Sequence, residues 1–281
     1  MNSEQQVVPE GLSFLHLVWG QEDECEAETD KEFQSLGKKA PACLEQIGTV
    51  LSLTDRMASC WWVCRGGDHA IEYLLGRVAS NARAALRLLR FGFYDESLVL
   101  SRAIGETANL LQLFCHNKDS LQDWRALSRK DRMKMFSPVK VRCRLEELQT
   151  LPLINEERYR LLCERAVHVQ PETKPQSHNI LGVPGTGAIL QCEGVLVCLN
   201  EIALPTSGAA CFGAATLDLE VEVKETIFSA AKDLVNEIGS ANITEIDDYH
   251  RHVFDNSQAR DEIANMADFL RRFQRSCRTR T

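Results

Sequence analysis

The stretch that decides the fold is residues 68–117, DHAIEYLLGRVASNARAALRLLRFGFYDESLVLSRAIGETANLLQLFCHN. Apolar residues recur at helical spacing in its first half and again in its second half, and the short turn at Gly92 separates the two patterns. A short connection between two long helices makes them antiparallel neighbours. The stretch therefore predicts a helical hairpin formed by residues 68–91 and 94–117.

Helical spacing continues on both sides of this hairpin. The apolar stretch 188–204 fits either a buried helix or a strand, and we favour the helix. Shorter helices are expected where a capping residue precedes an acidic or proline-containing first turn. The longer helices are expected at residues 41–65, 217–238 and 257–277, and the shorter ones are expected to start at Ser128, Ser137 and Asn155.

These patterns predict an all-α fold, a multi-helix bundle with a central antiparallel helical hairpin. Proline, glycine and a run of acidic residues interrupt the N-terminal part, so residues 1–40 are interpreted as an irregular arm. The bundle is then expected to occupy residues 41–281. The loop 169–188 is rich in proline and glycine, and it is the best place for a subdivision of the bundle.

The composition and charge of the chain indicate a globular protein and disfavour proteins with an extended nucleic-acid surface, membrane-spanning proteins and secreted proteins. The chain has 281 residues, of which 44% are hydrophobic and 26% charged, which is typical of a globular protein with a real core. Its net charge of −8 disfavours an extended nucleic-acid surface. No stretch approaches the roughly 18 consecutive apolar residues of a membrane span. The start of the chain carries no basic residue, so no signal peptide is predicted. The eleven cysteines, an odd number, are expected to be reduced thiols of a cytoplasmic protein.

The second helix of the hairpin carries an unusual polar stripe. Arg102, Glu106, Asn109 and His116 share one face of a helix that is otherwise almost wholly apolar. A buried charge is costly unless it is paired, so we expect Arg102 and Glu106 to be substantially buried and in contact. Two interpretations stay open. The stripe is either a structural ion pair, with Asn109 holding a loop, or a polar functional site framed by the bundle.

A second group of polar residues follows the helix expected at Asn155. His168 ends that segment, and His178 and Asn179 lie in the loop that comes after it. Histidine exchanges protons readily near neutral pH, so His168 is a candidate proton-transfer group beside the stripe. The alternative is a histidine that binds carbonyl groups at a helix end, where the helix dipole favours its charged form.

Two stretches carry a family resemblance. The segments ARAALRLLRFGFYDESLVLSRAIGETANLLQLF and YRLLCERAVHVQP resemble a pattern in uncharacterised bacterial all-helical proteins. Such proteins resemble, more distantly, the HEPN superfamily of helical bundles, many of which are dimeric ribonucleases of toxin and phage-defence systems. The match covers residues 68–117 and 158–171. The chain departs from the HEPN pattern, in which an arginine precedes a histidine by a few residues on one helix.

The resemblance implies a metal-independent ribonuclease without a cofactor. His168 would transfer the proton, Arg102 would stabilise the developing charge on the phosphate, and Glu106 would orient one of them. Asn109, His116, His178 and Asn179 are candidate RNA-binding residues. The alternative function is a non-catalytic helical module that binds a partner protein or forms a homodimer through an apolar face such as Trp61-Trp62.

One set of residues could hold a metal ion. Cys60 and Cys64 are four residues apart in a segment expected to be helical, and His69 follows the Gly66-Gly67 turn. Three soft ligands can bind zinc, but a fourth is not evident in the sequence. Cysteines on an apolar helix usually belong to the core. We therefore predict no metal site here.

Overall fold

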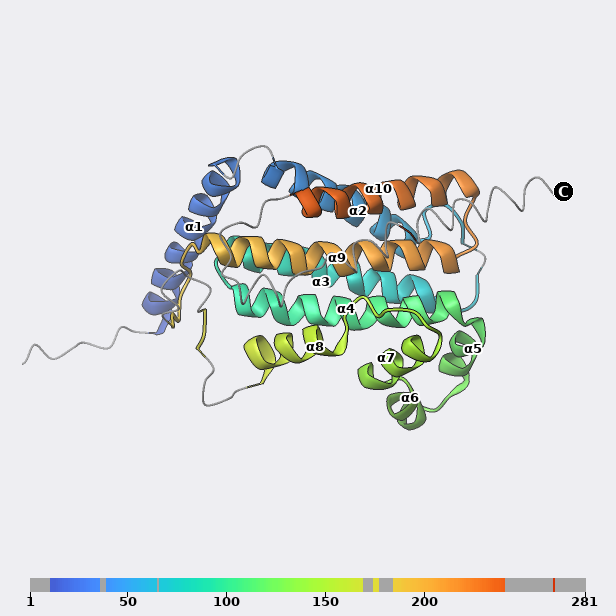
Figure 1. Cartoon of the computed structure of the whole chain (residues 1–281). Helices are drawn as coiled ribbons and strands as arrows, with labels where there is room; N and C mark the ends of the chain where they lie inside the picture. Colours follow the sequence, from blue (N-terminus) through green and yellow to red (C-terminus); the bar gives the residue numbers. More distant parts are fainter. Residues whose placement is uncertain are drawn as a thin grey trace, which may run out of the picture.

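The all-α fold is confirmed by a computed structural model of the chain, which describes residues 11–35, 39–64, 66–168, 174–176, 184–240 and 265. The ordered segments of this part are helices joined by short loops (Figure 1). In chain order they are α1 (Gly11–Ser35), α2 (Lys39–Ala58), α3 (Ala70–Arg90), α4 (Tyr94–His116), α5 (Lys118–Ala126), α6 (Arg129–Met135), α7 (Pro138–Glu147), α8 (Glu156–Leu162), the π-helical turn η1 (Cys163–Val167), α9 (Cys192–Thr216) and α10 (Val221–Ser240).

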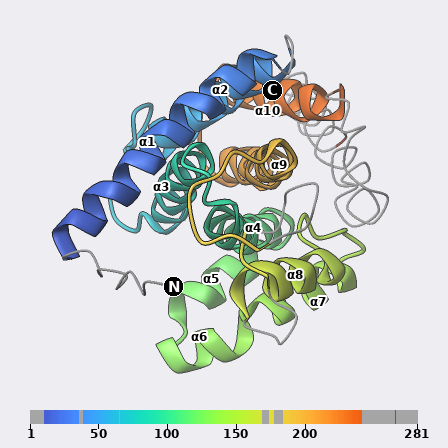
Figure 2. The ribbon, with the colours of Figure 1, turned by 90° about the vertical axis from the view of Figure 1, so that its left-hand side faces the viewer.

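The predicted hairpin is present as α3 and α4, which pack against each other along their length. The helix α9 lies beside both of them and also packs against α2 and α10, so it occupies the centre of the bundle (Figure 2). By length and composition alone α9 could cross a membrane, but 94% of its most apolar window is buried inside the protein. It is the core helix of the bundle, and the apolar stretch 188–204 is helical from Cys192 onward, as favoured.

The helices α6, α7 and α8 begin where the sequence places a capping residue or a first-turn proline. The side chain of Ser128 accepts a hydrogen bond from the backbone of Asp131 at the start of α6. Asn155 does the same for the backbone of Arg158 at the start of α8. Pro138 occupies the first turn of α7, where a missing backbone N–H costs nothing. These three starts confirm the sequence-based predictions.

The prediction of an irregular N-terminal arm at residues 1–40 is wrong for its described part. Residues 11–35 form the helix α1, which crosses one end of the bundle (Figure 1). Cys25, Thr29 and Phe33 are buried on its inner face, and their spacing of four residues places them on one side of a helix. The glycines and the acidic run suggested a loop, but Asp23, Glu24 and Glu28 are exposed on the helix and Glu26 pairs with arginines of α3.

The end of α2 also differs from the prediction. The helix was expected to run over residues 41–65 and to stop at Gly66-Gly67, but it ends at Ala58. Cys60 adopts a left-handed conformation with φ of 55°, which turns the chain out of the helix. The two glycines lie in the loop that follows, with φ of 70° and 90°. Cys60 and Cys64 therefore do not share a helix face, because both come after the helix.

The predicted loop 169–188 is non-helical where it is described. Its residue Gln176 is buried and binds the start of α4. The side-chain oxygen of Gln176 accepts a hydrogen bond from the backbone N–H of Tyr94, at 3.0 Å, and its backbone N–H donates to Asp95 at 2.7 Å. The loop thus caps a helix far from it in sequence. The helix expected at 257–277 lies outside the described residues, apart from Asn265, which is helical, and the subdivision at this loop stays a prediction.

Candidate functional site

The predicted contact between Arg102 and Glu106 is present on α4. The Nε of Arg102 donates to Oε1 of Glu106 at 3.0 Å, and its Nη2 lies 2.8 Å from the same oxygen. The two side chains are 20% and 30% exposed, so the pair is only partly buried, less than the sequence led us to expect. The pair is therefore screened by water on one side.

Tyr159 on α8 covers the inner side of this pair. Its hydroxyl accepts a hydrogen bond from Nη2 of Arg102 at 2.7 Å. The guanidinium of Arg102 lies 4.7 Å from the centre of the Tyr159 ring, and that of Arg142 from α7 lies 4.4 Å from it. Burial is the largest single influence on the pKa of Arg102 and would lower it, but Glu106, Cys163 and Tyr159 together have a larger opposite effect, so the pKa is raised. Burial and Glu106 raise the pKa of Tyr159 as well. Arg102 stays charged and Tyr159 stays neutral, so the cluster joins α4, α7 and α8 without exchanging protons near neutral pH.

Asn109 holds a loop of its own chain. Its amide donates to the carbonyl of Ile154 at 2.9 Å and its side-chain oxygen accepts from the N–H of Ile154 at 3.1 Å. Gln112 binds the backbone of Leu151 and Leu153 in the same manner. Together the side-chain amides of Asn109 and Gln112 hold the backbone of residues 151–154 against α4. Of the two interpretations of Asn109, the structure matches the loop-holding one.

His116 is the last residue of α4, whereas Arg102 and Glu106 lie near the middle of this helix. The side chain of His116 is exposed on one side and packs on the other against Phe212 of α9, with ring centres 6.1 Å apart. Partial burial lowers the pKa of His116. His116 therefore belongs to the α4–α9 interface and is not adjacent to Arg102.

His168 ends η1, a turn that packs against α4. Its side chain is exposed, and its backbone N–H donates to the carbonyl of Cys163 at 2.7 Å. Among the residues that the structure describes, neither Arg102 nor Glu106 bonds to His168, because their hydrogen bonds go to each other and to Tyr159. His178 and Asn179 lie outside the described residues.

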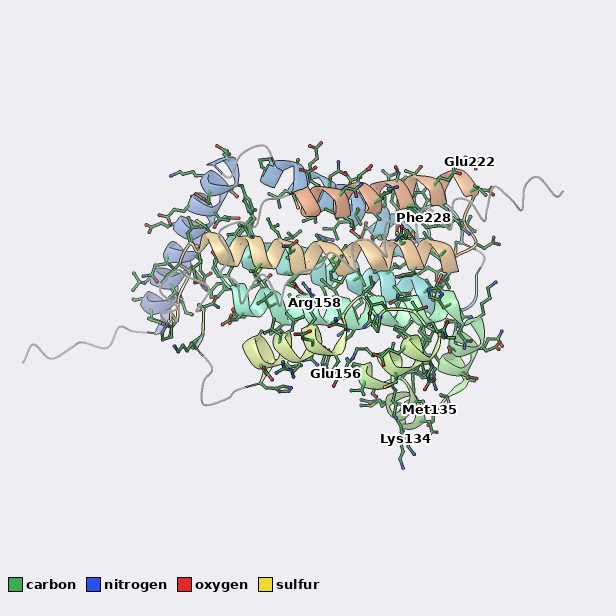
Figure 3. The ribbon with its side chains drawn as sticks, viewed as in Figure 1. Lys134, Met135, Glu156, Arg158, Glu222 and Phe228 are labelled. Carbon is green, nitrogen blue, oxygen red and sulfur yellow. The ribbon has the colours of Figure 1, made fainter. Side chains whose placement is uncertain are left out.

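A buried ion pair close to this cluster was not expected from the sequence. The Nε of Arg158 on α8 donates to Oε2 of Glu201 on α9 at 2.8 Å, and the second nitrogen of Arg158 contacts the other carboxylate oxygen. Their side chains are 6% and 0% exposed. Figure 3 shows Arg158 between α8 and the body of the bundle, and Glu156 of the same helix on the outer side. This pair joins α8 to the central helix.

The N-terminal half of α1 presents a large apolar surface. Five large hydrophobic side chains within eight residues are between 41% and 63% exposed. We call them the α1 apolar surface, and they are Leu12, Phe14, Leu15, Leu17 and Trp19. Isolated exposed apolar residues are common, but a contiguous group of large ones usually marks an interaction site.

Comparison with known proteins gives no match. No family model, no curated protein and no solved structure matches this chain. The resemblance to HEPN proteins therefore stays a prediction, and the functional argument depends on the geometry of the molecule.

The sequence indicated part of two features, the buried Arg158–Glu201 ion pair and the α1 apolar surface. Glu201 is an acidic residue in the middle of the apolar stretch that became the central helix, and a buried residue of this kind needs a cation as partner. The partner itself could not be chosen, because many arginines were available on other helices. The α1 apolar surface was visible as a cluster of apolar residues, but a chain interpreted as an arm gave no way to decide which side chains stay exposed.

Proposed function

We propose that the protein is a helical interaction module that binds a partner protein through the α1 apolar surface. The observation that carries the proposal is the exposure of five large hydrophobic side chains on one projecting helix. Water contact of so much apolar area is unfavourable, and burying it against a partner supplies the main driving force of association. Helices commonly bind partner proteins by placing such side chains in an apolar groove.

The second half of α1 fixes the helix to the bundle. Arg90 of α3 makes two parallel hydrogen bonds to Asp30, at 3.1 and 2.7 Å. Glu26 lies 3.0 Å from Arg90 and also pairs with Arg87, and the buried Phe33 packs into the core. Because the helix is anchored at this end, its exposed half is already in a defined conformation before binding. Such preorganisation lowers the entropic cost of association.

The charge of α1 indicates the chemistry of the partner. Residues 11–30 carry no lysine or arginine, and five acidic residues occupy positions 22–28 immediately after the apolar surface. Helices that bind anionic lipid surfaces are rich in basic residues, so a membrane is disfavoured. A second copy of this chain would bring two acidic segments together, which is also unfavourable. The partner that fits is a protein with an apolar groove bordered by basic residues.

The experiment uses the full-length protein with a photo-reactive phenylalanine analogue at Leu15 or at Trp19. Crosslinking in the source cells identifies the partner, and the purified pair is then titrated by calorimetry. The triple variant Leu12→Ser, Leu15→Ser, Trp19→Ser should lose at least about 100-fold in affinity, since central hydrophobic residues of an interface contribute about 2 kcal/mol or more each. Its melting temperature should stay unchanged, because the three side chains are exposed.

The matched control is the double variant Met133→Ser, Val139→Ser, which removes exposed apolar side chains from α6 and α7. It should bind as tightly as the wild type. Equal affinity of the α1 triple variant and the wild type would contradict the proposal. If light scattering shows that the wild type is a dimer and the triple variant is a monomer, the partner is a second copy of this chain and not another protein. If the protein alone binds anionic vesicles through this surface, the surface binds a membrane and not a partner protein.

The ribonuclease function implied by the resemblance is a separate prediction. Its proton-transfer residue would be His168, whose exposed side chain follows a turn packed against α4. Expression of the wild type and of His168→Ala at equal folded levels, followed by measurement of RNA integrity, tests it. Intact RNA with the wild type would exclude this function, whereas cleavage by both proteins would exclude only the role of His168.

A further inference from the structure

A cavity of about 330 Å³ lies beside the connection between α2 and α3. Cys60 and His69 line it, and Cys64 lies next to them. The sulfur of Cys60 is 3.6 Å from Nδ1 of His69, and the sulfur of Cys64 is 4.0 Å from Nε2 of the same ring. One ligand atom from each of the three residues lies within 4.8 Å of the others. Two thiols and an imidazole therefore converge at the edge of a cavity.

The three residues are close enough together for a zinc site. Zinc binds sulfur at about 2.3 Å and imidazole nitrogen at about 2.0–2.1 Å in a tetrahedron, which places the ligand atoms about 3.5–3.8 Å from one another. The two sulfur atoms lie beside different nitrogens of the His69 ring, only one of which can bind the ion, and one ligand atom from each residue lies within 4.8 Å of the others. Small rotations of exposed and half-exposed side chains are enough to reach the metal geometry. Two thiolates with one imidazole are also a ligand set that favours zinc over magnesium or calcium.

The backbone at Cys60 is an independent observation. The N–H of Cys60 donates to the carbonyl of Met57, and the N–H of Trp61 donates to that of Arg56. This pair of hydrogen bonds is the Schellman motif that ends many helices, and its left-handed position is normally occupied by glycine. Here the position is occupied by Cys60 with φ of 55°. A residue with a Cβ in this conformation is strained, and such strain is concentrated at functional sites.

Acidic residues around the site have different roles. Asp68 is engaged by Arg125, whose Nε lies 2.5 Å from its carboxylate, so it is not available as a ligand. Glu72 lies 3.6 Å from Nδ1 of His69. A carboxylate behind a metal-binding histidine orients the ring and raises its basicity. The protein thus offers three ligands and one orienting group, and two of the ligands, Cys60 and His69, lie on the wall of the cavity.

We propose that Cys60, Cys64 and His69 bind a zinc ion whose fourth coordination position is open to this cavity. Glu72 orients His69 by accepting a hydrogen bond from its Nδ1, which leaves Nε2 for the metal. Three protein ligands with an open position are typical of zinc ions that bind and polarise water or a small substrate, whereas closed sites with four protein ligands are structural. The site lies on a different element from the α1 apolar surface, so it does not depend on the proposed interaction.

The test measures metal binding by the full-length protein. Protein purified under reducing conditions should hold about one zinc per chain by mass spectrometry. Replacement of zinc by Co²⁺ should give the visible absorption of a tetrahedral site and a thiolate-to-cobalt charge-transfer band. Cys64→Ser and His69→Gln should each weaken zinc binding at least about 100-fold, and Glu72→Gln about 10-fold. An added small thiol should change the cobalt spectrum, because it enters the open position.

Two controls separate metal binding from folding. Cys60→Gly keeps the left-handed turn with the residue that suits it best, so this variant should fold normally and still lose the thiolate band. Cys143→Ser removes an exposed thiol of α7 and should bind zinc like the wild type. Zinc binding that is equal in the wild type and Cys60→Gly would overturn the proposal. A disulfide between Cys60 and Cys64 that persists under reductant, with no zinc bound, would overturn it as well.

Discussion

Two polar clusters of this protein differ in where their groups find partners. In the cluster between α4 and α8, Arg102, Glu106 and Tyr159 bond to one another. At the turn between α2 and α3, Cys60 and His69 face a cavity from a strained backbone. In the first cluster, Arg102 forms its hydrogen bonds to Glu106 and Tyr159 within the cluster, and the bond to Tyr159 joins α4 to α8. The second directs metal-binding atoms to a common point, as expected of residues that serve a ligand. Polar residues on the apolar helix α4 thus bind packing partners, whereas the proposed metal ligands lie after the end of α2.

The largest expected effect concerns the ion pair that joins α8 to the central helix. Glu201→Ala leaves Arg158 buried without its carboxylate, so the free energy of unfolding should fall by about 3–5 kcal/mol. Urea denaturation of the variant and the wild type measures it. Glu164→Ala is the matched control, because it breaks a pair with Arg160 whose side chains are 47% and 63% exposed, and it should cost less than about 0.5 kcal/mol. Similar losses in the two variants would contradict a sealed interior on this side.

A smaller loss is expected for the pair on α4. Glu106→Ala removes a partly exposed carboxylate, while Arg102 keeps its hydrogen bond to Tyr159. The free energy of unfolding should therefore fall by about 1–2 kcal/mol, less than for a fully buried pair. The same denaturation experiment measures this change. A loss as large as that of Glu201→Ala would mean that the cluster is closed to water, and no loss would mean that the pair does not join the helices.

The turn between α2 and α3 should respond in the opposite direction. Cys60→Gly removes the strain of a left-handed cysteine, so the metal-free protein should become more stable by about 1 kcal/mol. Thermal melting in the presence of a chelator and a reductant measures the gain. A lower melting temperature would show that the Cys60 side chain contributes to packing, and the contrast between the two clusters would fail.

The smallest effect concerns His116, which packs against Phe212. Burial lowers its pKa in the folded protein, so the unfolded chain binds a proton more readily at this position. As the pH falls below the ordinary histidine pKa of about 6.5, the unfolded state is favoured and stability decreases. His116→Gln should remove this part of the pH dependence, which is less than about 1 kcal/mol because the side chain is exposed to solvent. Melting temperatures between neutral and mildly acidic pH measure it, and an unchanged slope in the variant would contradict the assignment.

Much of the helical framework could be predicted because its signals are local. The spacing of apolar residues in α3 and α4 and the side chains of Ser128 and Asn155 mark helices without reference to the rest of the chain. The contact of Arg102 with Glu106 also follows from spacing on a single helix. In α1 the periodic signal was weak, because the exposed half is apolar almost all round.

The remaining features depend on contacts distant in sequence. Nothing near Arg158 shows that Glu201 is its partner, and no local pattern shows that Tyr159 lies against Arg102. The turn after α2 was mispredicted for a different reason. The sequence offers Gly66 and Gly67 as helix terminators, yet the chain uses Cys60, a residue type that rarely takes the left-handed conformation. Cys60, Cys64 and His69 were visible in the sequence as possible ligands, but their close approach could be judged only after the helix end was known.

The position of α9 has a consequence for how the chain folds. The first 190 residues contain α2, α3 and α4, which all pack on a helix that begins at Cys192. During synthesis, the apolar faces of these earlier helices that pack on α9 stay exposed until the central helix has left the ribosome. Contacts between segments so far apart slow folding and expose aggregation-prone surface in the meantime. The hairpin that dominates the sequence pattern therefore gains its packing against α9 only after residues 192–216 have been synthesised.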